Sequence, residues 1–87
     1  MNRGAVKPRT LELWQTKWCP ASHRVRVRLA ELGLAYTNRQ VPVDPYRRAH
    51  LEIATGLGTT PTLMADEHIV AGEDAILAFL TDHYAVS

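Results

Sequence analysis

The sequence predicts an α/β fold in which helices pack on a four-stranded mixed sheet. Short strand-like segments and segments of helical period alternate in the order β-α-β-α-β-β-α. The helix between the first two strands indicates a parallel pair, whereas the short step between the last two indicates a hairpin. Eighty-seven residues, of which 46% are hydrophobic and 22% charged, suit one globular domain with a modest core.

The strands are predicted from alternating or short apolar runs. They cover residues 10–16, 35–41 with an extension to Val43, 62–65 and 68–71. Asp44-Pro45 has the chemistry of a turn, and Asp66-Glu67 lies between the two strands of the hairpin. We therefore expect the sheet to gain an antiparallel half from the second part of the chain.

The helices are predicted from apolar residues at a spacing of three or four. They cover residues 22–32, 46–55 and 72–84. Gly33 and Gly56 follow the first two helices and suit a left-handed residue at a helix end. Ser22 is a favoured residue type for the N-cap of the first helix, although its hydroxyl is also placed to contact the neighbouring Cys19 sulfur.

Charge is unevenly distributed although the net charge is only +1. Residues 1–48 hold all ten Lys and Arg residues and three acids, so they carry +7; residues 49–87 carry −6. This predicts either a cleft with one positive and one negative wall, suited to a zwitterion, or two solvated faces of opposite sign. Residues 1–9 are expected to form a mobile basic tail before a domain spanning residues 10–87.

Several partner classes and locations are disfavoured by composition. The low net charge and few aromatic residues argue against nucleic acid. No apolar run approaches the ~20 residues of a membrane span, and residues 1–10 are polar and basic, unlike a secretory signal. A lone cysteine suits a reducing compartment, so we expect the cytoplasm.

Cys19, the only cysteine, stands between the first predicted strand and the first predicted helix. Unpaired N–H groups and the helix dipole favour a thiolate there, and the thiolate is the nucleophile. We expect its pKa to lie below that of a free thiol, helped by Lys17; the alternative is an inert core thiol. Arg24 is a further candidate for stabilising the thiolate or binding a substrate carboxylate. One cysteine excludes an internal disulfide, and the histidines lack metal-ligand spacing, so no metal site is expected.

Three segments, residues 18–26, 59–63 and 72–80, carry motifs in a characteristic order. The first (Trp-Cys-Pro-Ala-Ser-His-Arg-Val-Arg) resembles the active-site turn and helix of glutaredoxins. The second (Thr-Thr-Pro-Thr-Leu) resembles the segment that carries the cis-proline of the thioredoxin fold. The third resembles the last helix of the N-terminal domain of glutathione S-transferases, whose first residues hold the γ-glutamyl end of glutathione. Nearly the whole chain, residues 10–84, is covered, which implies a thioredoxin-like fold.

The resemblance implies a site for glutathione as co-substrate. Cys19 is the implied catalytic nucleophile, with Ser22 beside it. The implied glutathione-binding residues are Lys17, Trp18, Pro20, Thr60, Pro61, Glu73 and Asp74. A cis Thr60–Pro61 bond is expected to turn the backbone of Thr60 towards Cys19. Glu73 and Asp74 suit the amine of the γ-glutamyl group; their alternative role is simple complementarity with the helix dipole.

The expected activity is a glutathione-dependent thiol–disulfide oxidoreductase of the monothiol glutaredoxin type, because Ser22 stands where dithiol glutaredoxins have a second cysteine. Its partners are expected to be glutathionylated proteins or small disulfides. Glutathione transferases carry a helical C-terminal domain that these 87 residues lack, so transferase activity is less expected. The alternative is a non-catalytic module that binds glutathione, an iron–sulfur cluster or a protein partner.

Overall fold

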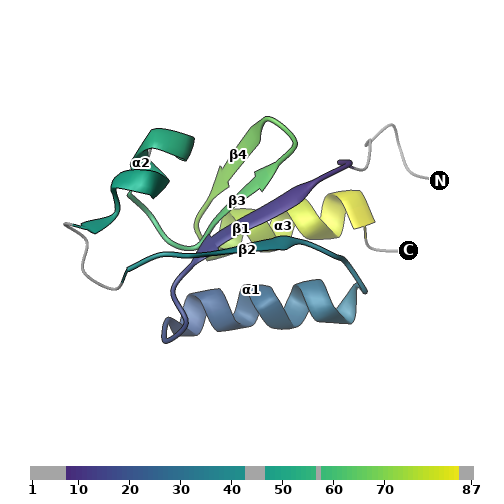
Figure 1. The fold of residues 1–87 in the computed structure, drawn as a ribbon. Helices are drawn as coiled ribbons and strands as arrows, with labels where there is room; N and C mark the ends of the chain where they lie inside the picture. Colours follow the sequence, from purple (N-terminus) through teal and green to yellow (C-terminus); the bar gives the residue numbers. More distant parts are fainter. Residues whose placement is uncertain (1–7, 43–46, 57, 85–87) are drawn as a thin grey trace.

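The predicted order of elements is confirmed by the computed structural model, which describes residues 8–42, 47–56 and 58–84 (Figure 1). The strands are β1 (Leu11–Gln15), β2 (Thr37–Gln40), β3 (Thr62–Ala65) and β4 (His68–Ala71), and the helices are α1 (Pro20–Glu31), α2 (Ala49–Thr55) and α3 (Glu73–Tyr84). The sheet order is β2-β1-β3-β4, with β1 and β2 parallel and the other neighbours antiparallel. This is the mixed four-stranded, thioredoxin-like α/β fold that the sequence predicts.

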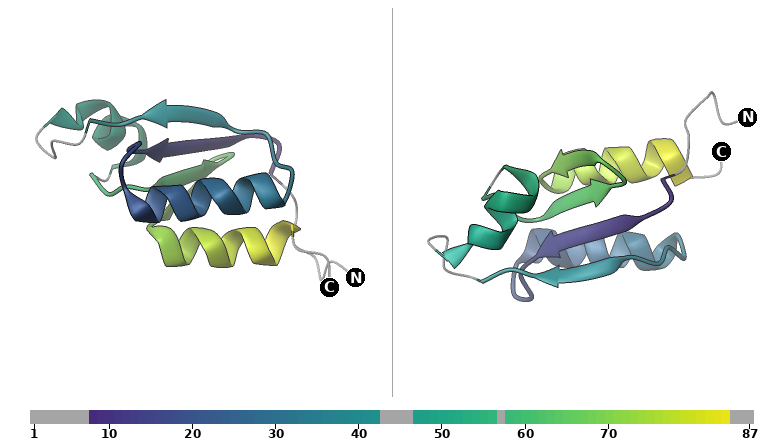
Figure 2. Two further views of the ribbon diagram at one scale, coloured as in Figure 1. Left: turned by 90° about the horizontal axis from the view of Figure 1, so that it is seen from below. Right: turned by 45° about the horizontal axis from the view of Figure 1, so that its top comes forward.

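The helices cover the two faces of the sheet unequally. Helices α1 and α3 lie side by side on one face, whereas the short α2 lies on the other, near the end of the sheet where β1 and β2 finish (Figure 2). Successive side chains of β1 point to opposite faces of the sheet. Those at odd positions are buried beneath α1 and α3. The core under these helices consists of Leu11, Leu13, Val25, Leu29, Leu63, Ala65, Ile76 and Leu80.

Helix α1 begins two residues earlier than predicted, which changes the role of two residues. Cys19 is the N-cap, and Pro20 is the first residue of the helix. Proline suits that position because its missing N–H would have no partner within the helix and its φ is already helical. Gly33 follows the helix with φ +67°, the left-handed conformation that was predicted.

The second strand and second helix are shorter than predicted. Strand β2 runs only from Thr37 to Gln40 and all four of its side chains are exposed, as befits an edge strand. Helix α2 begins at Ala49, and Gly56 after it has φ +74°. The predicted extension to Val43, the turn at Asp44-Pro45 and the predicted helix start at position 46 lie outside the described residues.

The hairpin turn between β3 and β4 holds the beginning of the described chain. Asp66, with φ +53°, accepts the backbone N–H of Arg9 (3.0 and 3.2 Å) and both the N–H and hydroxyl of Thr10 (3.0 and 3.2 Å). The backbone hydrogen bond from Thr10 is the main cause that lowers the pKa of Asp66. Most of the predicted tail, residues 1–7, lies outside the described ranges, whereas Arg9 is bonded to this turn.

Candidate active site

The three motif segments meet at one end of the sheet. Strand β1 ends at Gln15 and leads into the turn that carries Cys19. Strand β3 starts at that same end, because Thr62 lies opposite Trp14 of β1. The backbone N–H of Gly72 donates to the carbonyl oxygen of Pro61 at 2.9 Å, which brings the start of α3 to the start of β3. The turn at Cys19 and the loop at Pro61, 42 positions apart in the sequence, thus lie at the same end of the sheet as the start of α3.

Cys19 is half-buried, and its sulfur faces hydrogen-bond donors. Burial acts to raise the pKa of the thiol. The backbone N–H and hydroxyl of Ser22, the N–H of Ala21 and the hydroxyl of Thr16 act in the opposite direction and prevail, so that the pKa of Cys19 is lowered. The direction matches the prediction. The local hydrogen bonds cause it, and the expected contribution of Lys17 is not among the causes.

Ser22 is the third residue of α1 and does not cap the helix, so the preferred prediction for this residue was wrong. Its side chain is fully buried, and its hydroxyl has no hydrogen-bond partner of regular geometry. The same hydroxyl is among the groups that lower the pKa of Cys19. A buried hydroxyl without a settled partner is available to a thiolate, which is a better acceptor than a thiol.

The loop before β3 is fixed on both sides of its proline. The Thr60–Pro61 peptide bond is cis, which confirms the prediction. The buried hydroxyl of Thr62 donates to the carbonyl oxygen of Thr59 at 2.6 Å. Arg48, just before α2, donates to the carbonyl oxygen of Gly58 at 3.0 Å. The loop therefore has a defined shape beside the end of β1.

An ion pair joins α1 to α3 beside the thiol. Arg24 holds both carboxylate oxygens of Glu73, one of them at 2.8 Å. The hydrogen bond to Glu73 is the main cause that raises the pKa of Arg24, and the charge of the Cys19 thiolate makes a smaller contribution. The hydrogen bond from Arg24 is likewise the main cause that lowers the pKa of Glu73. Asp74, the other acid predicted to bind the amine, is exposed.

The remaining predicted glutathione residues lie on the surface of the turn. The Lys17 ammonium lies 5.2 Å from the centre of the Trp18 ring, and the Trp18 side chain is 77% exposed. Pro20 is exposed at the start of α1. Sequence reasoning missed Thr16, whose buried hydroxyl assists Cys19, because a threonine three residues before a cysteine carries no motif signal.

The charge-divided cleft, one of the two alternatives that the uneven charge distribution allowed, stays a prediction; residues of the two halves of the chain meet beside the thiol as the Arg24–Glu73 pair. A cavity between α2 and the sheet is lined, among the described residues, by arginines, a histidine and uncharged residues. Within the described ranges, no His, Cys, Asp and Glu group could hold a metal ion, and no helix is long and apolar enough to cross a bilayer.

Comparison with known proteins decides the family. The family model described as "Glutathione S-transferase, N-terminal domain" matches residues 18–83. The chain belongs to the glutathione S-transferase N-terminal domain family. The match contains all three motif segments and begins at the turn that carries Cys19; Lys17 lies one residue before it.

Solved glutathione transferases have the same fold. Glutathione transferase E6 from Drosophila melanogaster is 30% identical over 90% of this chain, with a TM-score of 0.79. Glutathione S-transferase 1-6 from Anopheles dirus species B is 25% identical over 87%, with a TM-score of 0.77. This chain covers only 36% and 37% of those two chains. Glutathione transferase Omega 3C from Trametes versicolor, at 22% identity and a TM-score of 0.74, shares the fold. No curated protein sequence matches.

Proposed function

We propose that this domain is a glutathione-dependent thiol–disulfide oxidoreductase that works by a monothiol route. The Cys19 thiolate attacks the glutathionyl sulfur of a mixed disulfide, forms a Cys19–glutathione disulfide and releases the partner's thiolate. The thiolate of a second glutathione attacks that disulfide, forms oxidised glutathione and regenerates the Cys19 thiolate. Each step exchanges one S–S bond for another, so no further oxidant or reductant is needed.

One observation carries the proposal: the half-buried Cys19 sulfur at the N-cap of α1 faces N–H and hydroxyl donors that lower its pKa. A lowered pKa raises the thiolate fraction near neutral pH and makes the sulfur a better leaving group in the second step. Access to the sulfur is kept, since the turn around it is exposed at Lys17, Trp18 and Pro20. A buried structural thiol would have neither property.

The proposed glutathione position follows from the groups around Cys19. The amine of the γ-glutamyl group meets Asp74, while the α-carboxylate lies at the N-terminus of α3. Thr60 and Pro61 bind the peptide backbone, and Lys17, Trp18 and Pro20 border the entrance. The partners are then glutathionylated proteins or small disulfides, in the reducing cytoplasm, where a lone thiol persists.

A deglutathionylation assay coupled to glutathione and its reductase tests the proposal. The unchanged domain should turn over, and Cys19→Ser should abolish turnover because no second cysteine exists. Ala78→Ser, an exposed change on α3, is a matched control and should retain full activity. Turnover that persists in Cys19→Ser would exclude Cys19 as the nucleophile.

A binding module without turnover is the second candidate. It is favoured by the exposed Asp74 at the start of α3 and by the cis Thr60–Pro61 bond, because these features suit binding of glutathione whether or not Cys19 reacts. Glutathione titrated against backbone amide shifts should then perturb Lys17, Cys19, Thr60 and Asp74 while the assay stays silent. An iron–sulfur cluster, the other form of this candidate, would show visible absorption in protein purified without air.

A further inference from the structure

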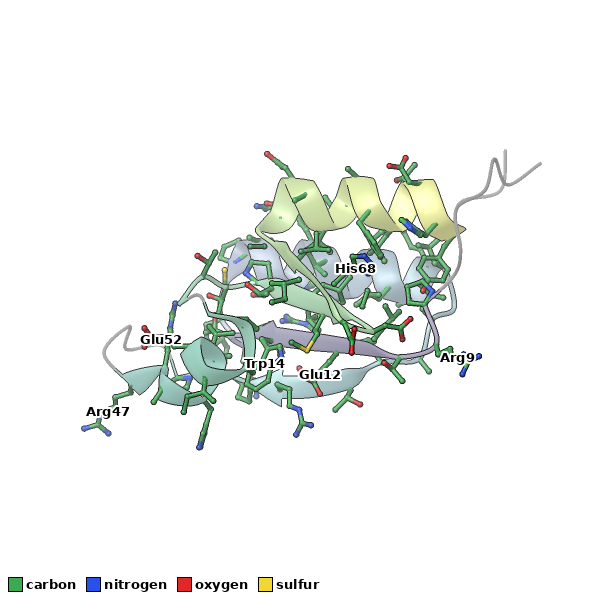
Figure 3. All side chains as sticks on the ribbon, turned by 90° about the horizontal axis from the view of Figure 1, so that it is seen from above. Arg9, Glu12, Trp14, Arg47, Glu52 and His68 are labelled. Atoms are coloured by element: carbon green, nitrogen blue, oxygen red, sulfur yellow. The ribbon has the colours of Figure 1, made fainter. Side chains whose placement is uncertain are left out.

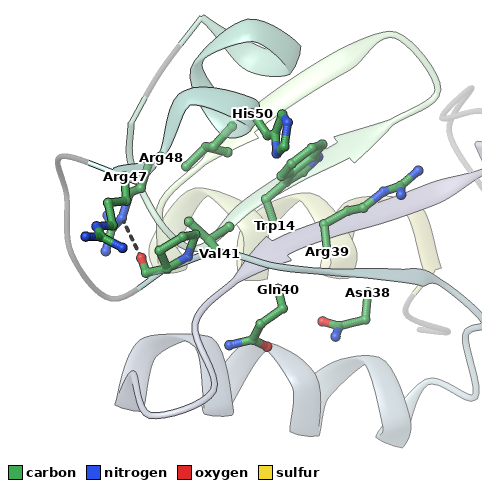
Figure 4. Close-up of a pocket in the computed structure, with 10 residues that line it drawn as sticks. Trp14, Asn38, Arg39, Gln40, Val41, Arg47, Arg48 and His50 are labelled. Carbon is green, nitrogen blue, oxygen red and sulfur yellow. Dashed lines mark hydrogen bonds between the residues drawn. The ribbon is translucent and has the colours of Figure 1, made fainter.

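The cavity between α2 and the sheet is a second candidate site. It lies on the face of the sheet opposite α1 and α3. Its volume is about 400 Å³, and it lies between α2 and the carboxyl ends of β1 and β2 (Figure 4). This volume is in the range of small-molecule sites. Cys19 and the other proposed glutathione residues do not line it. The cavity is therefore separate from the site described above.

The apolar part of the cavity is built around a tryptophan. Trp14 projects from β1 towards α2, and Figure 3 looks onto the sheet face that carries Trp14 and Glu12. Glu12 fixes the indole by accepting its Nε1–H at 2.9 Å. Val41, Pro42 and Leu51 complete the apolar lining. An aromatic ring or an apolar body finds a preformed surface here.

The polar part of the cavity is cationic. Among the described residues, its lining includes Arg39, Arg47, Arg48 and His50 and no carboxylate, and Arg48 also donates to the carbonyl oxygens of Pro42 and Gly58. Arg39 lies over the Trp14 ring at 5.8 Å and donates one N–H to Glu12 at 3.0 Å. A guanidinium has five N–H donors, so Arg39 retains donors for a ligand. Glu12 thus orients both the indole and the guanidinium.

We propose that this cavity binds a phosphate monoester with an aromatic body, of the size of a mononucleotide. A phosphate monoester carries a charge of about −1.5 to −2 at neutral pH. It is therefore attracted to a group of arginines more strongly than a ligand with a single carboxylate would be. Guanidinium groups bind phosphate oxygens in a bidentate manner. The cavity is larger than a bare phosphate needs, and Trp14 offers its ring system for stacking with a base.

Adenosine monophosphate is the probe for this proposal. In a Trp18→Phe background, Trp14 is the only tryptophan, so quenching of its fluorescence reports the cavity. The monophosphate should quench the fluorescence at lower concentration than adenosine or inorganic phosphate does. Adenosine lacks the phosphate that the arginines would bind, and inorganic phosphate lacks the base that would stack on Trp14. In the unchanged chain, amide shifts should centre on β2 and α2, and saturating glutathione should leave the affinity unchanged.

Arginine variants locate the binding. Arg39→Gln should weaken binding of the monophosphate by roughly threefold to tenfold, the effect of losing one charge-assisted hydrogen bond at a half-exposed site. Arg28→Gln on α1 makes the same change on the opposite face and should have no effect. The proposal is overturned if the monophosphate does not bind, if adenosine binds equally well, if glutathione displaces it, or if Arg28→Gln weakens it as much.

Discussion

Arg24 of α1 binds Glu73, the first residue of α3, through two guanidinium N–H groups. The helix that begins at Cys19 is thereby joined to the helix that is proposed to hold glutathione. The carboxylate of Glu73 is engaged within the protein, whereas Asp74 beside it is exposed. Two neighbouring acids that look equivalent in sequence therefore differ in the structure: Glu73 joins α3 to α1, whereas the exposed Asp74 is the acid that we propose to bind the ligand.

This difference predicts two distinct mutant phenotypes. Asp74→Asn should raise the KM for glutathione by about threefold to tenfold and leave the Tm unchanged, because it removes a charge-assisted contact with the ligand. Glu73→Gln should lower the Tm and affect the KM less, because it breaks the tie between the helices. Coupled-assay kinetics and thermal unfolding of both variants measure this. The reverse pattern would show that Glu73 is the ligand residue.

Ser22→Ala is expected to slow the reaction without destabilising the fold. The hydroxyl lowers the pKa of Cys19, so its removal should leave less thiolate and reduce the alkylation rate at neutral pH by roughly twofold to tenfold. The hydroxyl has no regular partner to lose, so the Tm should stay constant or rise. Iodoacetamide kinetics and thermal unfolding test both statements. An unchanged rate would mean that the hydroxyl does not contact the thiolate.

The Cys19 thiol should titrate below its ordinary range. Because its pKa is lower in the folded state, the thiolate adds to stability above the unfolded-state pKa, and this contribution is lost as pH falls through the folded-state pKa. Thiolate absorbance and alkylation rate should rise with pH through one midpoint that moves up in urea. The urea-unfolded chain is the control, and equal midpoints in both states would contradict the nucleophile role.

Asp66 should make the fold sensitive to acid. Its pKa is lowered by the hydrogen bonds from Thr10 and Arg9, so its contribution is complete above the unfolded-state pKa and is lost as pH falls through the folded-state value. Asp66→Asn should therefore reduce the Tm at neutral pH and flatten its fall below about pH 4. Glu67→Gln, the next residue of the same turn, is the control. A Tm profile like that of the unchanged chain would show that Asp66 does not hold the N-terminal segment.

The order of elements and the position of Cys19 at the start of α1 were predictable because local patterns indicate them. Period-two and helical segments are sequence features, and a proline after the cysteine marks a helix start within two residues. The role of Ser22 was misjudged because N-cap preference was applied without the shift that Pro20 causes.

Contacts between residues far apart in the sequence could not be predicted from the sequence alone. The Arg24–Glu73 pair joins residues 49 positions apart, and the donors to Asp66 come from residues 56 and 57 positions away. Such pairs depend on how the helices and strands pack, which no local pattern specifies. The cavity at Trp14 was missed for the same reason, because it is formed only when α2 folds over the opposite face of the sheet.

The isolation of α2 has a consequence for local unfolding. This helix has seven residues, buries only Leu51 and Thr55, and leaves Ile53 83% exposed. So short a helix is not stable by itself, and its amides should exchange with solvent deuterium well before those of α1 and α3, which share the main core. The fold thus combines two slowly exchanging helices, α1 and α3, with a short helix, α2, that borders the cavity and unfolds locally at much lower free energy.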